Sequence, residues 1–374
     1  MGNNNLSKQN KNLSENKKEF KFVLTRNNIS DITIYYNYEK KYESISSKNS
    51  PHKNQNNNYI FIICGLIDGF IEIYKNVFNG EFKLSLSFKA HNDVVSKIIQ
   101  LKNNGYLLAS SFDNSFKIFK LSKNCTRETL IYKIYLNPIF NRINDIILHN
   151  KESLIISVFN HIIYFPYNKN NLSENKNNLS DYVYSKYQHQ YKYLSNLVGI
   201  NDKIFLTLYE IENKILFFKL IPTENINQDI EYIKSVLICS KEENNNDSDS
   251  KICIENLFPK YNFILLSINN YIKIIDIKYL EIIIIYEMKI PSFFLYHNNP
   301  IDRILLFGGN NILTYKIKKG NGGINFVEEN HKCFEINIIN GLNKIRKSVS
   351  NPLNNNIIYI FYKKILMKIE LNYD

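Results

Sequence analysis

A strand–turn–strand unit recurs along the chain, and this repetition limits the possible folds more than any other feature of the sequence. The two clearest copies are "CGLIDGFIEIYK" (64–75) and "SSFDNSFKIFKL" (110–121), each with an aspartate in its turn. Weaker copies follow at 157–167, 208–220, 267–277, 307–317 and 358–371. The units share a marker position near their end, occupied by Tyr74, Phe119, Phe165, Phe218, Ile275, Tyr315 and Ile369. Neighbouring markers lie about 40 to 57 positions apart, a period typical of a repeat architecture.

Further strand-like runs extend each unit toward four strands. In the first repeat, "ISDITIYY" (29–36) supplies a first strand and "KLSLSFKA" (83–90) a last one, while "DVVSKIIQL" (93–101) opens the second repeat. The N-terminal run "KEFKFVLT" (18–25) has no partner nearby, and we expect it to pair with "ILMKIEL" (365–371). Such pairing removes open edges from the terminal sheets. The sequence therefore predicts an all-β chain: a seven-bladed β-propeller whose last blade is closed by the N-terminal strand.

Asparagine-rich tracts interrupt the strand-like runs. Polar tracts of this kind bury too little apolar surface to offset the entropy lost on ordering. We expect a disordered tail at 1–17, a single propeller over 18–374, and disordered inserts near 44–58, 167–180 and 241–251. No apolar run reaches the roughly 20 residues of a membrane span, and the N-terminus has no apolar core typical of a secretory signal.

The second repeat resembles the WD40-repeat family. It carries Ala90–His91 where that family has Gly-His, "SSFD" (110–113) where the family has a serine followed by an aspartate turn, and "KIFK" (117–120) where the family has Trp-Asp. The chain contains no tryptophan. By period the resemblance covers the whole chain, whereas the specific motifs cover only about 60–121. The resemblance implies a divergent WD40-type propeller.

The resemblance also implies a structural hydrogen-bond relay. We expect His91 to bond Asp113, Ser111 to bond the histidine, and the relay to end at Phe119, which has no donor where the family has an indole N–H. The competing interpretation is a hydrolase triad of the same three polar residues. A nucleophilic serine needs an exposed, strained turn, yet Ser111 lies in an expected strand and no G-x-S-x-G motif is present. We therefore expect no enzyme and no catalytic residue.

The remaining residue patterns give no cofactor or metal site. The five cysteines are scattered, without C-x-x-C pairs or clustered histidines. We expect reduced thiols in a cytoplasmic or nuclear protein. The glycine-rich stretches lack the strand-to-helix context of a phosphate loop.

A non-catalytic scaffold for protein–protein interactions is the function that the resemblance implies. The order of segments up to "LIYKIYLNPIFNRI" (130–143) is similar to the start of ASTRA-associated protein 1 and its animal relative, the G-protein-β-like protein 1. That similarity implies a subunit of a kinase-maturation or chromatin-remodelling assembly. Ile67, Phe112 and Phe159 are apolar residues of the turns on one face. They are candidate partner contacts, or they fold inward.

The formal net charge of +12 at pH 7 leaves a second class open, a basic propeller that binds RNA or an anionic membrane surface. The lysines are spread along an Asn-, Lys-, Ile- and Tyr-rich chain, which favours compositional bias over nucleic-acid binding. Gly2 fits an N-myristoylation motif only with its register shifted by one, because Leu6 stands where the hydroxyl residue belongs and Ser7 follows. We expect membrane contact only if Gly2 is acylated.

Overall fold

The computed structural model describes only part of the chain, and every element in that part is a β-strand. The described residues are 21–36, 60–76, 81–101, 105–136, 142–149, 153–159, 161–166, 185–188, 194–200, 203–209, 214–222, 228–237, 253–256, 263–268, 271–276, 283–289, 293–298, 303–308, 311–320, 323–328, 347–351, 354–362 and 364–370. The expected all-β class is confirmed for these residues. Gly2, the tail 1–17 and the inserts 44–58, 167–180 and 241–251 lie outside them.

The first half of the chain forms four-stranded antiparallel sheets whose strands are neighbours in sequence. One sheet holds β2 (Ile29–Tyr36), β3 (Ile60–Leu66), β4 (Phe70–Asn76) and β5 (Phe82–Lys89). The next holds β6 (Val95–Leu101), β7 (Tyr106–Ser111), β8 (Ser115–Leu121) and β9 (Glu128–Tyr135). A third holds β10 (Ile143–His149), β11 (Ser153–Val158), β12 (His161–Pro166) and β13 (Ser185–Gln188).

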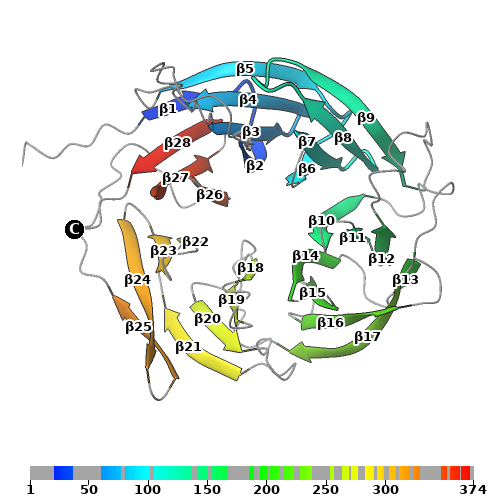
Figure 1. The fold of residues 1–374 in the computed structure, drawn as a ribbon. Helices are drawn as coiled ribbons and strands as arrows, with labels where there is room; N and C mark the ends of the chain where they lie inside the picture. The colour runs from blue at the N-terminus through cyan, green and yellow to red at the C-terminus, as the bar shows by residue number, and fades with distance from the viewer. Residues whose placement is uncertain are drawn as a thin grey trace, which may run out of the picture.

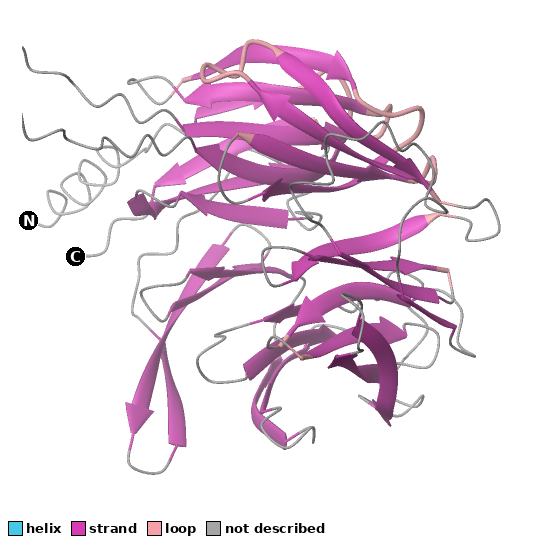
Figure 2. Ribbon diagram, turned by 45° about the vertical axis from the view of Figure 1, so that its right-hand side comes forward, coloured by secondary structure: helices cyan, strands magenta, loops and turns pink. Residues whose placement is uncertain are grey.

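The second half repeats the same order. The sheets are β14 (Leu194–Gly199), β15 (Ile204–Tyr209), β16 (Lys214–Pro222) and β17 (Gln228–Leu237); then β18 (Cys253–Asn256), β19 (Phe263–Ile268), β20 (Tyr271–Asp276) and β21 (Ile283–Lys289); then β22 (Phe293–Asn298), β23 (Arg303–Gly308), β24 (Asn311–Gly320) and β25 (Gly323–Glu328). In Figure 1 the sheets follow one another in chain order around a common centre, an arrangement compatible with a β-propeller. Figure 2 shows the same strands after a 45° turn about the vertical axis.

The remaining sheet combines both ends of the chain. Its strands are β1 (Lys21–Leu24), β28 (Ile365–Glu370), β27 (Asn354–Tyr362) and β26 (Lys347–Asn351), hydrogen-bonded in that order. β1 runs antiparallel to β28, with Lys21 opposite Lys368 and Leu24 opposite Ile365. Beyond β1, the Thr25 N–H donates to the Lys364 carbonyl at 2.8 Å. The pairing expected for "KEFKFVLT" is thus present over the residues described.

Apolar side chains fill the spaces between sheets. Between the sheets of β2–β5 and β6–β9, the buried cluster includes Tyr35, Phe61, Leu107, Ala109 and Phe119. Strands β3 and β7 are buried along almost their whole length because they have a neighbouring strand on each side and a sheet on each face. Burial of such β-branched and aromatic runs is the main stabilising contribution in a chain without disulfides among its described cysteines.

Polar side chains fasten one innermost strand to the next at bulges. β2 shifts register between Ile29 and Asp31, where the Ser30 hydroxyl donates to the Val95 carbonyl at 2.7 Å and an Asp31 carboxylate oxygen accepts from the Ile98 N–H at 2.6 Å. The extra residue of a bulge turns its side chain out of the ladder, which lets it reach the adjacent sheet.

The same pattern returns two sheets later. β10 shifts register between Ile143 and Asp145; Asn144 donates to the Leu194 carbonyl at 2.9 Å, and Asp145 accepts from the Leu197 N–H at 2.8 Å. A repeated sequence position therefore makes a repeated contact between sheets.

Candidate functional site

The candidate site is built where the turns of two adjacent sheets meet. We call it the loop end; it comprises the β3–β4 turn (66–70), the segment between β5 and β6 (89–94) and the β7–β8 turn (111–115). The Gly69 carbonyl accepts hydrogen bonds from the backbone N–H groups of Ala90, at 3.0 Å, and His91, at 2.9 Å. These bonds join the first sheet to the segment that carries His91.

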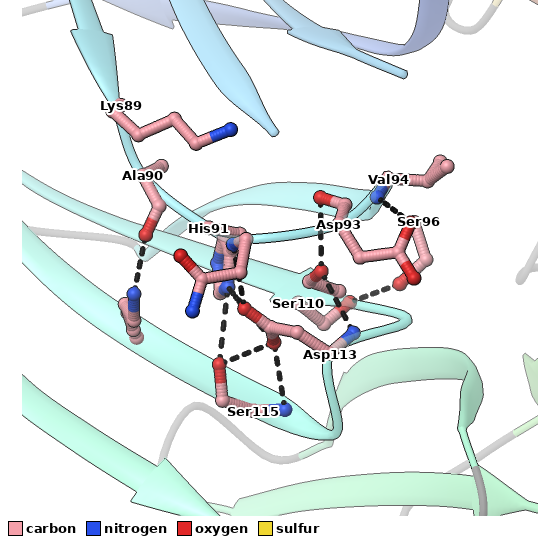
Figure 3. A network of polar contacts seen from close by, with 12 residues as sticks. Lys89, Ala90, His91, Asp93, Val94, Ser96, Ser110, Asp113 and Ser115 are labelled. Carbon is pink, nitrogen blue, oxygen red and sulfur yellow. Dashed lines mark hydrogen bonds and ion pairs between the residues drawn. The ribbon is translucent and has the colours of Figure 1, made fainter. Parts of the chain in front are cut away.

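The structure brings His91 and Asp113 together (Figure 3). Nδ1 of His91 lies 3.2 Å and 3.3 Å from the two carboxylate oxygens of Asp113, and the two side chains are 0% and 10% exposed. With Asp113 ionised, Nδ1 carries the proton and donates it. The contact joins the loop before β6 to the turn between β7 and β8.

Asp113 is held by three further donors. Its carboxylate accepts from the Asn92 N–H at 2.9 Å, from the Ser115 N–H at 3.0 Å and from the Ser115 hydroxyl at 2.6 Å. An aspartate that bonds the backbone two residues later forms an Asx turn, and this one closes the β7–β8 turn around Asn114, whose φ is 63°. A carboxylate with this many donors is fixed in position.

The position expected for Ser111 is occupied by Ser115. The Ser115 hydroxyl lies 3.1 Å from Nδ1 of His91, whereas the Ser111 hydroxyl donates to the Asp93 carbonyl at 3.2 Å and accepts from the Asp113 N–H at 3.1 Å. The expected bond from Ser111 to the histidine is therefore replaced. The reason is the alternation of the strand: Ser111 ends β7 and its side chain turns to the backbone of the 92–94 segment.

This arrangement does not suit nucleophilic catalysis. In a serine hydrolase the nucleophile and the carboxylate contact opposite nitrogens of the imidazole, so that a proton passes from one side to the other. Here Ser115 and Asp113 both contact Nδ1. The Ser115 hydroxyl also points its proton at Asp113, a weak base because hydrogen bonds from His91 and Ser115 hold its pKa well below the usual range.

The pKa values of the pair follow from burial and hydrogen bonding. Burial lowers the pKa of His91, an effect assisted by the charge of Lys117 and opposed by Asp113 and the Ala109 backbone. For Asp113, burial alone would raise the pKa, but hydrogen bonds from His91 and Ser115 outweigh it and hold that pKa well below its usual range. At neutral pH the pair is a neutral imidazole that donates to a carboxylate.

The relay ends at the other ring nitrogen. Nε2 of His91 is buried and has no hydrogen-bond partner among the described residues. Ala109, fully buried on β7, offers no side-chain donor. Phe119, the expected end of the relay, is 4% exposed and packs edge-on against Phe88 with ring centroids 5.1 Å apart. Such a ring pair contributes about 1 kcal/mol beyond its buried area.

The three expected contact residues lie in turns at one end of successive sheets. Ile67 is 36% exposed. Phe112 is half-buried, with the Arg142 guanidinium 4.8 Å from its ring centroid. Phe159 is half-buried with a φ of 40°, and its carbonyl accepts from the Leu194 N–H at 3.0 Å. The structure thus leaves Ile67 most accessible and partly covers the other two.

Sequence reasoning found the contact between His91 and Asp113 but missed three other residues of the site, Ser115, Asn92 and Lys117. Ser115 carries a usable signal, because Asp-x-Ser at a turn is the spacing of an Asx turn closed by its own side chain. Asn92 carries none, since only its backbone N–H takes part. Lys117, whose ammonium group donates to the Ala90 carbonyl, required knowledge of the β7–β8 register.

The described residues also bear on three other features: metal sites, membrane-spanning helices and reactive thiols. They contain no group of three or more His, Cys, Asp or Glu side chains placed to hold a metal ion. They also contain no helix that is long and apolar enough to cross a membrane. Cys64 and Cys125 are free and buried, and burial raises the pKa of Cys125 to about 12. A thiol with that pKa is unreactive at neutral pH.

No protein-family model and no curated protein match this chain.

Proposed function

We propose that the chain is a divergent WD40-type β-propeller of seven blades, closed by its N-terminal strand, and that it is a non-catalytic scaffold for protein–protein interactions within a multisubunit complex. The four-stranded sheets and their order in the chain support the repeat architecture. Pairing of β1 with β28, and the Thr25 bond to Lys364, support closure of the last blade. Residues 18–374 then form one domain.

The observation that carries the functional proposal is the use of the polar residues at the loop end. The contact between His91 and Asp113 joins two loops, and the Gly69 carbonyl joins the His91 loop to the neighbouring sheet. Side chains whose hydrogen bonds are directed at one another and at the protein's own backbone make a rigid surface instead of a reactive centre. A rigid surface lowers the entropy lost when a partner binds.

Ile67, Phe112 and Phe159 are the proposed partner contacts on this surface. Ile67 is the strongest of the three because it is 36% exposed in a turn. Large apolar side chains at partly exposed positions are enriched at the centres of protein interfaces. The likeness to ASTRA-associated protein 1 in the first two repeats makes a kinase-maturation or chromatin-remodelling assembly the proposed complex, in the cytoplasm or the nucleus.

Purification of the tagged full chain from its native cells tests the scaffold. We expect a fixed set of proteins to remain bound through size-exclusion chromatography in stoichiometric amounts, as identified by mass spectrometry. Elution of the chain alone, or with RNA as its only companion, would contradict the proposal.

A pair of engineered cysteines tests closure. Lys21→Cys with Lys368→Cys places the thiols on directly opposed residues, whereas Lys21→Cys with Lys364→Cys places them about 13 Å further along the ladder. We expect mild oxidation to crosslink only the first pair, detected as a crosslinked peptide by mass spectrometry. Equal crosslinking of both pairs would contradict a fixed β1–β28 register.

The second candidate is a basic propeller that binds RNA or an anionic membrane, favoured by the net charge of +12. Its signature is binding that weakens steeply as salt concentration rises. Co-sedimentation with phosphatidylserine vesicles, and RNA that co-purifies at low salt but is lost in a high-salt wash, separate this candidate from the protein scaffold.

A further inference from the structure

Cationic side chains lie over aromatic rings around the loop end. The pairs are Arg26 over Phe70 at 3.6 Å, Lys89 over Phe70 at 5.2 Å, Lys133 over Tyr135 at 4.2 Å and Arg142 over Phe112 at 4.8 Å. Each ring supports the charged group above an apolar base; Lys89 also donates to the Asp68 carbonyl, and Lys133 is half-buried. We call this set the cation rim.

The register of the strands places the whole cation rim at one end of the sheets. Phe70 opens β4 opposite Lys89, and Tyr135 closes β9 opposite Ser115, beside the β7–β8 turn. Arg142 directly precedes β10, on the side where β10 meets the end of β11. Arg26 lies between β1 and β2 and pairs with Asp68 of the β3–β4 turn at 3.3 Å. The cations therefore lie at the same end of the sheets as the β3–β4 turn that carries Ile67.

The carboxylates near this surface leave an excess of positive charge. Asp113 is held by His91 and Ser115, and Asp68 pairs with Arg26. Asp93 is the remaining carboxylate of the loop end, is exposed, and offsets one of the cations Lys89, Lys133 and Arg142. Lys89 and Arg142 are exposed and have no carboxylate within ion-pair distance among the described residues. Ile67 and Tyr135, 36% and 40% exposed, add apolar surface between the charges.

We infer that the cation rim docks an acidic, extended peptide segment of a partner protein, with an apolar side chain of that segment seated against Ile67. The inference rests on the proposed scaffold function and names the partner chemistry. Carboxylates complement Lys89, Lys133 and Arg142, and an apolar anchor complements Ile67. Single-stranded RNA would also meet the cations and rings, but it offers no aliphatic side chain to seat against Ile67, so RNA is an alternative outcome of the test.

Selection from a displayed library of short random peptides on the immobilised full chain tests this inference. We expect enrichment of peptides that combine several Asp or Glu residues with one or two large apolar residues. The matched variants reverse three charges each, one set at the loop end and the other at the far end of the sheets β2–β5 and β6–β9. The rim variant is Lys89→Glu, Lys133→Glu and Arg142→Glu; the control is Lys83→Glu, Lys120→Glu and Arg127→Glu, three exposed cations at the far end.

For the selected peptides, we expect fluorescence anisotropy to show a Kd at least about tenfold higher for the rim variant and an unchanged Kd for the control. Ile67→Ser should weaken binding with little change in salt dependence. Enrichment without acidic residues, or equal loss in both triple variants, would overturn the inference. A uridine oligonucleotide that binds with the same rim dependence, while acidic peptides do not, would also overturn it in favour of nucleic acid.

The failure of this inference is distinguishable from failure of the scaffold. If native partners co-purify equally with the wild-type chain and the rim variant, the scaffold stands and the docking surface lies elsewhere. If no protein co-purifies while selected acidic peptides still bind the cation rim, the docking surface is supported and the proposed scaffold function is contradicted.

Discussion

Two adjacent turns at the loop end reach similar shapes by different means. The β3–β4 turn uses Gly69 at a φ of 81°, pressed against the His91 backbone. The β7–β8 turn uses Asn114 at a φ of 63° and the four contacts around Asp113. Both turns carry an aspartate, but Asp68 lies at the surface and pairs with a half-exposed Arg26. Asp68 makes only a long contact of 3.4 Å with the Phe70 N–H of its own turn, where Asp113 accepts from the Ser115 N–H at 3.0 Å. The same residue type is therefore held more tightly in one turn than in the other.

Gly69→Ala should disrupt the β3–β4 turn and give the largest loss of stability. A Cβ at this position would lie 2.2 Å from the His91 carbonyl oxygen, in a backbone conformation that alanine rarely adopts. We expect a loss of at least about 3 kcal/mol in the free energy of unfolding, measured by urea denaturation. Gly199→Ala is the control, because its Cβ would lie 3.8 Å from the nearest atom. Equal losses in the two variants would refute close packing at Gly69.

Asp113→Ala should disrupt the β7–β8 turn with a somewhat smaller loss of stability. It leaves Nδ1 of His91 and the Asn92 N–H without their acceptor, and we expect a loss of about 2–3 kcal/mol and a lower Tm by calorimetry. Asp68→Ala removes the corresponding aspartate of the other turn and should cost less than about 1 kcal/mol. An unchanged Tm for Asp113→Ala would rule out the structural role of the relay.

Acidification should weaken the β7–β8 turn, which contains Asp113, before it weakens the β3–β4 turn. The folded-state pKa of His91 lies below its unfolded value of about 6.5, so its contribution is complete above that pH and is lost as pH falls toward the folded value. Asp113, with a depressed pKa, contributes fully above about pH 4 and loses that contribution below it. We expect Tm to fall between pH 7 and pH 5. Burial also lowers the pKa of His161, so the readout is the difference from His91→Asn, whose profile should be flatter.

Ala109→Ser should give the smallest change, and a stabilising one. A hydroxyl on this buried strand position supplies a donor close to the ring of His91, whose Nε2 lacks a partner among the described residues. We expect a gain of about 0.5–1 kcal/mol in urea denaturation. Ala109→Val adds volume without a donor, so a gain shared by both variants would point to cavity filling instead.

The strand pattern and the period were readable from the sequence because they depend on local chemistry. Alternating β-branched and aromatic runs, and Asp-Gly or Asp-Asn turns, marked β3, β4, β7 and β8 correctly. The His91–Asp113 contact was predictable only through resemblance, since these residues lie 22 positions apart.

The identity of the serine and the contacts at the bulges were not predictable. Ser111 and Ser115 lie on the two sides of the β7–β8 turn, and which of them reaches the ring depends on where the 89–94 segment crosses that turn, a property of the assembled sheets. The same holds for Ser30 and Asp31, whose partners belong to another sheet.

The pairing of β1 with β28 sets a timing problem for the growing polypeptide. The hydroxyl of Thr25 bonds a carbonyl 339 positions further along, so its partner emerges from the ribosome roughly 20 to 70 s later at ordinary synthesis rates. Throughout that interval β1 is an unsatisfied strand that any exposed edge could capture. A nascent chain of this kind has a use for a chaperone that shields its first thirty or so residues until translation ends.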